Sequence, residues 1–207
     1  AVRERKVEPE EDNMLKITGD GRKASVDMRL IDRSNSAFEN GKTVLASRKI
    51  FGIWKQTEAD RSTQIVFLDL GIPGGKTFGV YQDMKNQLVE KGVPEEEIAF
   101  IHDFENKVKK ARLFEDMNQG KVRILFGSTF KMGTGMNVQD KLIAVHHIDA
   151  PWRPSDIEQR NGRALRQGNE NKEVEILIYA TEGSFDSYIW QLIEGKAKTF
   201  GIMTSGE

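Results

Sequence analysis

An arginine-rich segment near residue 160 has the side chains that bind phosphate groups. The stretch PSDIEQRNGRALR, residues 154–166, starts like a helix and carries Arg160, Arg163 and Arg166. Arg163 and Arg166 are three positions apart, so they share a helix face and can present two guanidinium groups to one anion. Gly162 costs about 1 kcal/mol relative to alanine inside a helix, which indicates that something approaches the backbone there. The alternative is a solvated basic stripe with helix-spaced salt bridges.

A second segment, GSTFKMGTGMNVQD at residues 127–140, follows a predicted strand and is rich in glycine and hydroxyl groups. Gly133 and Gly135, on either side of Thr134, can bring bare backbone N–H groups against a phosphate or a sugar. Three neighbouring side chains can also donate hydrogen bonds: Ser128, Thr129 and Lys131. Taken alone, such a pattern is more often an ordinary turn after a strand.

A third segment, GIPGGKT at residues 71–77, is close to a phosphate-binding P-loop but has the wrong spacing. A P-loop needs a glycine, four residues, and then Gly-Lys-Ser/Thr. Counting back from Gly75-Lys76-Thr77, the first glycine belongs at position 70, which is Leu70 here, and Gly71 comes one residue late. We therefore interpret the segment as a flexible loop after a strand, with Gly74 and Gly75 at its rim.

Alternating strand and helix patterns position these loops. We expect strands at residues 64–70, 98–102, 122–126, 144–148 and 174–179, and helices at residues 81–91, 107–118, 155–165 and 184–200. An earlier helical stretch, residues 43–56, places five apolar residues near one face: Val44, Leu45, Ile50, Phe51 and Trp54. Strands that are apolar nearly throughout favour helices on both faces. The sequence thus predicts an α/β fold with an open, mainly parallel sheet whose functional loops follow the carboxyl ends of the strands.

Composition limits the remaining classes of function. Lys and Arg number 31 against 32 Asp and Glu in 207 residues, so any nucleic-acid surface must be a local patch. With no cysteine and three histidines, we expect no metal site in this chain. No apolar run reaches the roughly 20 residues that span a bilayer, so we expect a soluble, cytoplasmic protein. The charged start at Ala1 indicates a piece of a longer chain.

The motifs resemble those of a known family of motor proteins. QRNGRALR, residues 159–166, has the Gln-x-x-Gly-Arg-x-x-Arg form of motif VI of superfamily-two helicases, and GTGMNVQ, residues 133–139, resembles their motif V. DAPWRPSD, residues 149–156, is similar to an Asp-x-x-Trp-Asn-Pro element of the second RecA-like domain in Swi/Snf-type DNA translocases. The resemblance covers residues 42–197. The amino-acid sequence of these motifs is most similar to that of phage- and plasmid-borne proteins that join a helicase to a DNA methylase or act against restriction.

Two positions depart from the Swi/Snf pattern. Arg153 stands where remodellers usually have Asn, and Asn169 stands where they usually have Gln. Both lie at the edges of the motif, so they concern the remodeller subfamily more than the motor.

The resemblance implies a RecA-like domain with a C-terminal brace helix at residues 42–207, after a charged leader and helical approach segment at residues 1–41. In such motors ATP lies between two RecA-like domains, and the first domain mainly holds the ATP and its Mg²⁺. Arg163 and Arg166 would be catalytic arginine fingers at the γ-phosphate, an effect of about 10³ to 10⁵ in rate in related enzymes. The isolated chain would then hydrolyse essentially no ATP.

The resemblance also assigns binding roles. The nucleotide-binding residues would be Gly133, Gly135, Asn137, Gln159, Arg163 and Arg166. The residues on the DNA backbone would be Ser128, Thr129, Lys131 and Thr134, and such contacts carry no sequence information. The implied partners are DNA, a first RecA-like domain of the same full-length chain and a methyltransferase domain.

Other interpretations stay open at this stage. The chain could be a non-catalytic RecA-like module that binds nucleic acid or acts as a scaffold, or a free-standing P-loop kinase built on residues 71–77. Adjacent His146 and His147 fit a buried strand, where we expect satisfied core histidines and not ligands. We expect Trp152 to pack against the arginine helix. We expect Phe185, Tyr188, Ile189 and Leu192 to form a helical stripe, in the core or against a partner domain.

Overall fold

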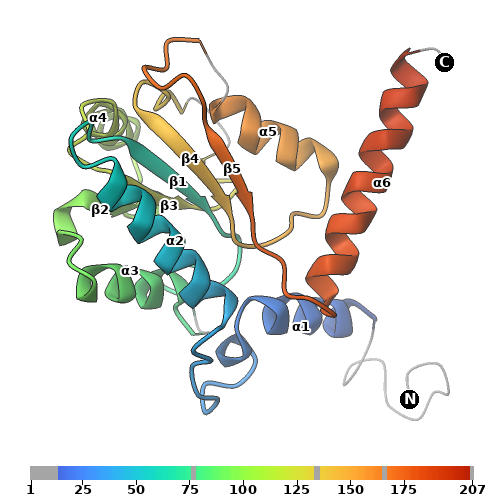
Figure 1. Ribbon diagram of the computed structural model, residues 1–207. Helices are drawn as coiled ribbons and strands as arrows, with labels where there is room; N and C mark the ends of the chain where they lie inside the picture. Colours follow the sequence, from blue (N-terminus) through green and yellow to red (C-terminus); the bar gives the residue numbers. More distant parts are fainter. Residues whose placement is uncertain (1–13, 76–77, 133–135, 165–166, 206–207) are drawn as a thin grey trace, which may run out of the picture.

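A parallel sheet forms the centre of the molecule. The computed structural model describes residues 14–75, 78–132, 136–164 and 167–205, without the side chains of residues 163–164 and 196–205. The sheet has five strands in the order β2-β3-β1-β4-β5, and every pair is parallel (Figure 1). The strands are β1 (Thr63–Phe67), β2 (Ile98–Phe100), β3 (Ile124–Gly127), β4 (Leu142–His147) and β5 (Glu175–Ile178). The predicted open parallel sheet is confirmed.

Helices cover both faces of the sheet. Successive side chains of β1 point to opposite sides, and all five of its residues are buried, so each side needs a covering layer. Val66 belongs to the core formed with α2 (Lys42–Gln56) and α3 (Val80–Glu90), whereas Ile65 and Phe67 belong to the core formed with α4 (Lys107–Asn118). Helix α5 (Pro154–Ala164) lies on the Phe67 side, where the Arg160 guanidinium is 5.1 Å from the centre of the Phe67 ring. The helices thus cover the faces of the sheet, and loops follow the carboxyl ends of its strands.

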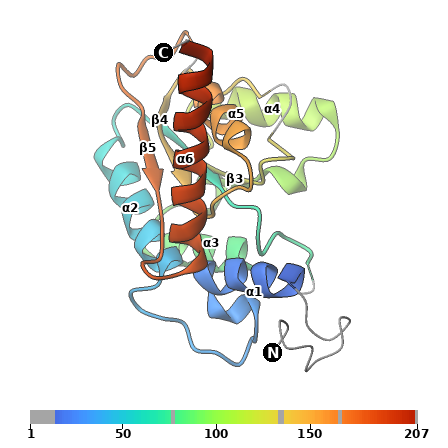
Figure 2. The ribbon, with the colours of Figure 1, turned by 90° about the vertical axis from the view of Figure 1, so that its right-hand side faces the viewer.

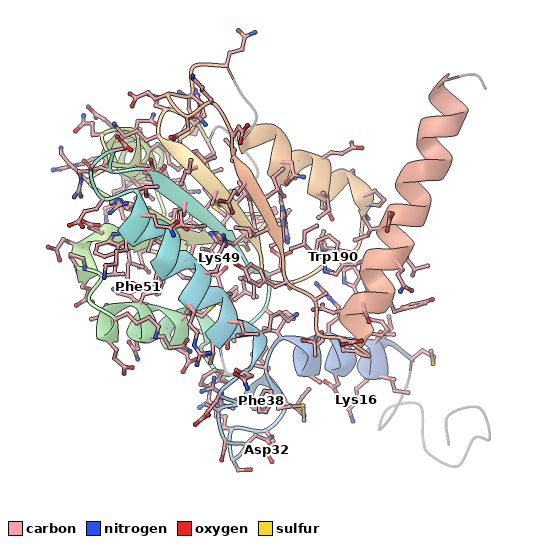
Figure 3. The ribbon with its side chains drawn as sticks, viewed as in Figure 1. Lys16, Asp32, Phe38, Lys49, Phe51 and Trp190 are labelled. Atoms are coloured by element: carbon pink, nitrogen blue, oxygen red, sulfur yellow. The ribbon has the colours of Figure 1, made fainter. Side chains whose placement is uncertain are left out.

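Two further helices lie outside the sheet. Helix α1 (Met14–Val26) runs into a short 3-10 helix (Met28–Leu30), and α6 (Phe185–Ser205) rises from α1 (Figures 1 and 2). Figure 3 shows Trp190 of α6 beside α5, and its ring centre lies 6.2 Å from that of His147. The base of α6 is therefore attached both to α1 and to the central domain.

Some local expectations are wrong. Within the predicted leader and approach segment at residues 1–41, the helix begins as early as Met14. Leu45 was placed on the buried face of α2, yet it is 45% exposed, and the buried residues Ala46, Ile50 and Ile53 define that face. Strand β5 is mostly exposed because it is the edge strand, although Lys49 of α2 reaches over it and pairs with Glu175 at 3.1 Å (Figure 3).

The loop that imitates a P-loop is shaped by its glycines. Gly71 has φ +62°, and a Cβ added there would lie 2.5 Å from Val80 Cγ2 at the start of α3. Gly71 is thus required for a left-handed turn that packs closely on the next helix. Gly74 has φ +76° but faces open space. Lys76 and Thr77 lie outside the described residues.

Candidate site at the carboxyl end of the sheet

Three loops and one helix meet around Arg160 of α5. Asp69 follows β1, Thr129 follows β3 and Asp149 follows β4. Arg160 Nη2 lies 2.9 Å from Asp69 Oδ2, 2.7 Å from Thr129 Oγ1 and 3.4 Å from Asp149 Oδ1. Thr129 donates to Asp69 twice, from its backbone N–H at 2.6 Å and from its hydroxyl at 2.8 Å. This cluster fixes the three loops relative to α5.

Burial determines the electrostatics of the cluster. The Arg160 side chain is 0% exposed, and a charge so deep in a protein is tolerated only when it is paired and hydrogen-bonded. Arg160 Nη1 also donates to the Asp149 carbonyl oxygen at 3.1 Å. Burial raises the pKa of Asp149 to about 6, and the positive charge of Arg160 opposes that rise. The donors of Arg160 are therefore engaged inside the protein, which makes it a positioning residue and not a phosphate ligand.

Two histidines of β4 support the same region. His146 Nε2 lies 2.9 Å from Gln64 Oε1 and its Nδ1 lies 2.9 Å from Tyr179 Oη, while His147 Nε2 lies 2.9 Å from Asn161 Oδ1 of α5. Burial lowers the pKa of His146 to about 3 and that of His147 to about 4, so both rings are neutral at pH 7. The prediction of satisfied core histidines is confirmed, and the bond from His147 adds a second anchor for α5.

A groove of about 840 Å³ lies beside the cluster. It brings together four residues whose roles were predicted from the sequence: Ser128, Thr129, Lys131 and Gln159. The other residues that line it are Asp69, Ile72, His102, Lys110, Phe130 and Asp156. Of the predicted backbone-contact residues, Ser128, Thr129 and Lys131 thus share one surface, which three strand-end loops, α4 and α5 form together.

Asn137 lies elsewhere. It lines a separate hollow of about 540 Å³ beside α4, with Asn118 and Asp140 among its neighbours. The Asn137 carbonyl oxygen accepts a hydrogen bond from Asn118 Nδ2 at 3.0 Å. Of the two described residues that were predicted to bind nucleotide, Gln159 is therefore grouped with the DNA-contact candidates and Asn137 is not.

Several predicted site residues cannot be placed. Gly133, Thr134, Gly135 and Arg166 lie outside the described residues, and Arg163 lies in α5 without a described side chain. Their roles stay predictions.

Gly162 and Trp152 do not have the surroundings that the sequence predicted for them. A Cβ on Gly162 would meet no atom within 4 Å, so packing within the described chain does not require glycine there. Trp152 is 51% exposed, and its ring contacts are with Phe185 of α6 and the guanidinium of Arg22 in α1. It therefore packs at the junction of these helices, in place of the predicted packing against α5.

Sequence reasoning missed the network of Asp69, Asp149 and Arg160. A usable signal was present, since Asp69 lies at the end of one predicted strand and Asp149 comes directly after another, where parallel strands bring polar residues together. Arg160 was grouped with Arg163 and Arg166 as one basic stripe, and only the fold separates its buried role.

A family comparison decides what kind of domain this is. Residues 72–168 match the model of the helicase conserved C-terminal domain, which includes most of the groove and all of α5. This part of the chain is similar to a helicase C-terminal domain. The resemblance inferred from residues 133–139 and 159–166 is therefore confirmed.

Two curated proteins are similar to this helicase C-terminal domain. The defense against restriction protein B of Escherichia phage P1 is 33% identical over 86 residues, which are 42% of this chain and 4% of that protein. The uncharacterized ATP-dependent helicase YqhH of Bacillus subtilis (strain 168) is 34% identical over 86 residues, which are 42% of this chain and 15% of that protein. The first bears out the predicted likeness to anti-restriction proteins. The chain spans only a small part of the length of these relatives.

Solved structures share the fold. The C-terminal part of the Fun30 ATPase domain matches with a TM-score of 0.57 and 20% identity, over 77% of this chain and 47% of that one. S. cerevisiae Dbp5 bound to RNA and ADP BeF3 matches with a TM-score of 0.54 and 17% identity, over 78% of this chain and 37% of that one. At these identities the likeness shows the RecA-like fold alone. Within the described part of the chain, no helix is long and apolar enough to cross a membrane.

Proposed function

We propose that this domain is the second motor domain of an ATP-dependent DNA helicase or translocase, and so part of a larger ATP hydrolase. The observation that carries the proposal is the groove within and beside the helicase C-terminal match, which collects Ser128, Thr129 and Lys131 at the carboxyl end of the sheet. The Ser128 hydroxyl and the Lys131 ammonium group suit the phosphate oxygens of a nucleic-acid backbone, while Thr129, whose hydroxyl and N–H donate to Asp69, holds the loop in place. Such contacts make the grip indifferent to sequence.

The nucleotide would be held from two sides. ATP supplies the phosphoanhydride bond whose cleavage drives movement, and a first RecA-like domain outside these residues would hold most of the nucleotide and its Mg²⁺. Arg163 and Arg166 are proposed for the γ-phosphate, because their spacing of three in the sequence would put two guanidinium groups on one face of a helix, where they could hold one anion. Arg160 does not suit it, since its donors are engaged by Asp69, Thr129 and Asp149.

Mg²⁺ ligands are also assigned to the first domain. Asp69 and Asp149, the carboxylates beside the groove, are both paired with Arg160, and their oxygens accept internal hydrogen bonds. Among the described residues, no group of three or more His, Asp or Glu gathers to hold a metal ion. This chain would contribute orientation, because Arg160 and the bond from His147 to Asn161 fix the direction of α5.

The deciding experiment is the Arg166→Ala substitution in the full-length protein. As an arginine finger, Arg166 stabilises charge in the transition state, so the DNA-stimulated ATPase rate should fall about 10³-fold or more, while DNA affinity stays within about twofold. Arg112→Ala is the matched control, because Arg112 is an exposed arginine on α4 that does not line the groove. Unchanged ATPase activity in Arg166→Ala would favour the non-catalytic scaffold instead.

The biological setting belongs to the same proposal. The phage relative is a defense against restriction protein, which supports a role of the full-length protein near DNA methylation or restriction. A methyltransferase domain as partner and a cytoplasmic location are proposed on that basis. We further expect the 207-residue chain alone to hydrolyse essentially no ATP.

A further inference from the structure

The tip of the loop after β3 exposes an aromatic ring. Phe130 is 87% exposed, although the residues on both sides of it are fixed. Thr129 is held by Asp69 and Arg160, and Met132 is 1% exposed. The Met132 N–H donates to the Ser128 carbonyl oxygen at 3.0 Å, which closes the turn. The turn therefore presents Phe130 to solvent in a defined position.

Close packing explains why the turn is rigid. A Cβ added to Gly127 at the end of β3 would lie 2.6 Å from the side chain of Met132, so Met132 sits directly against the strand backbone. With Thr129 pinned on one side and Met132 buried on the other, Phe130 and Lys131 are the two exposed residues at the tip. A residue whose backbone is held in advance loses less conformational entropy when it binds than one on a mobile loop.

The groove around the ring carries charged and apolar side chains. Phe130 lines the groove together with Ile72, His102, Lys110 and Lys131. Burial lowers the pKa of His102, and the nearby positive charges of Lys131 and Lys110 lower it further, so the imidazole is neutral at pH 7. Asp69 and Asp156 also line the groove, and the negative charge of Asp69 is paired with Arg160. The ring thus lines the same groove as two lysines that can hold phosphates.

The chemistry of phenylalanine limits the classes of ligand that the ring can bind. A phenyl ring has no hydrogen-bond donor and offers phosphate nothing, but its face can stack on another flat, apolar surface. Lone exposed apolar side chains are common and need no partner, so exposure alone decides nothing. Here the ring is preorganised and lies beside phosphate-binding donors, and the flat surfaces attached to a phosphate backbone are nucleobases. In a duplex those faces are already covered by neighbouring bases.

We propose that Phe130 stacks on an unpaired nucleobase of the strand whose phosphates contact Lys131. This inference rests on the proposed function and goes further, because it makes the grip selective for single-stranded over duplex DNA. Base–aromatic stacking tolerates every sequence, so the motor stays indifferent to sequence. Phe130 is then a substrate-contacting residue, and the helicase motifs found in the sequence gave it no role.

The test measures binding of the full-length protein to a labelled single-stranded oligothymidine and to a duplex of the same length. Phe130→Ala should weaken binding to the single strand by about 5- to 150-fold, the usual loss for one stacked base, and should change duplex binding by less than about twofold. Phe130→Trp should keep the affinity, whereas Phe130→Leu, which is apolar but has no ring, should lose it as alanine does. The fluorescence of 2-aminopurine in the strand should be quenched by the wild type and not by Phe130→Ala.

Lys131→Ala is the matched control from the same turn. As a phosphate contact it should weaken single-stranded and duplex binding alike. Full affinity in Phe130→Leu, or an equal loss on both DNA forms in Phe130→Ala, would overturn the stacking inference alone. A wild-type protein that binds neither form would overturn the proposed function itself, so the two failures are distinguishable. Since the ring is exposed, thermal unfolding of all variants should match the wild type.

Discussion

Arg160 joins three strand-end loops through one buried guanidinium. Its replacement by alanine removes the positive partner of the Asp69 carboxylate and leaves the Asp149 carboxylate, which is 1% exposed, with the more distant Arg22 Nη2 at 3.7 Å. Breaking a buried pair by removing one partner typically costs about 3–5 kcal/mol, because a charge stays buried without compensation. We therefore expect Arg160→Ala to lower the free energy of unfolding by about that amount, as measured by urea denaturation.

An exposed arginine provides the comparison. Arg112→Ala on the surface of α4 should change the free energy of unfolding by no more than about 0.5 kcal/mol. Arg160→Lys should recover only part of the stability, since an ammonium group cannot reach Thr129, Asp69 and the Asp149 carbonyl with one planar fork. If Arg160→Ala unfolds at the same urea concentration as Arg112→Ala, the network contributes no stability.

The loop between β1 and α3 depends on one of its glycines far more than on another. Gly71→Ala forces a left-handed φ of +62° on a residue with a Cβ and places that Cβ 2.5 Å from Val80 Cγ2, so we expect a loss of about 2–4 kcal/mol. Gly74→Ala meets the same backbone cost at φ +76° but no neighbour, so it should lose only about 1–2 kcal/mol. Urea denaturation of the pair separates the steric part. Equal losses would show that contact with Val80 is not the constraint.

The elements that could be predicted are those whose signals are local. The helix expected at residues 107–118 has those bounds because the Asn106 side chain accepts from Lys109 N–H at its start and Gly120 adopts φ +71° after its end. Features that depend on distant residues were missed. Arg160 reads as part of a surface stripe until the fold brings Asp69, 91 positions away, against it. Likewise β5 reads as a buried strand, and only its place at the sheet edge exposes it.

At the scale of the whole molecule, the N-terminal helix closes the base of α6. Thr181 Oγ1 donates to the Ser25 carbonyl oxygen at 2.9 Å, and Arg22 Nη2 donates to the Ala150 carbonyl oxygen at 3.0 Å. A Cβ on Gly21 would lie 3.3 Å from Phe185, which shows how closely α1 approaches α6. A buried ion pair between Lys42 and Asp186 ties α6 to α2 as well.

These contacts give the proposed boundary between residues 41 and 42 a measurable consequence. A chain that starts at residue 42 keeps Lys42 and both cores of the sheet, apart from Val26 and Leu30 at the margin of one of them. It loses every contact of α1 with α6. We expect hydrogen exchange in residues 185–195 to approach that of a fraying terminus, while the amides of β1, β3 and β4 keep their protection. Arg22→Ala in the intact chain should cause a smaller change of the same kind. Loss of protection in the three strands would show instead that residues 14–41 belong to the folding unit of the motor domain, because α1 would then stabilise the sheet and not only the helix that rises from it.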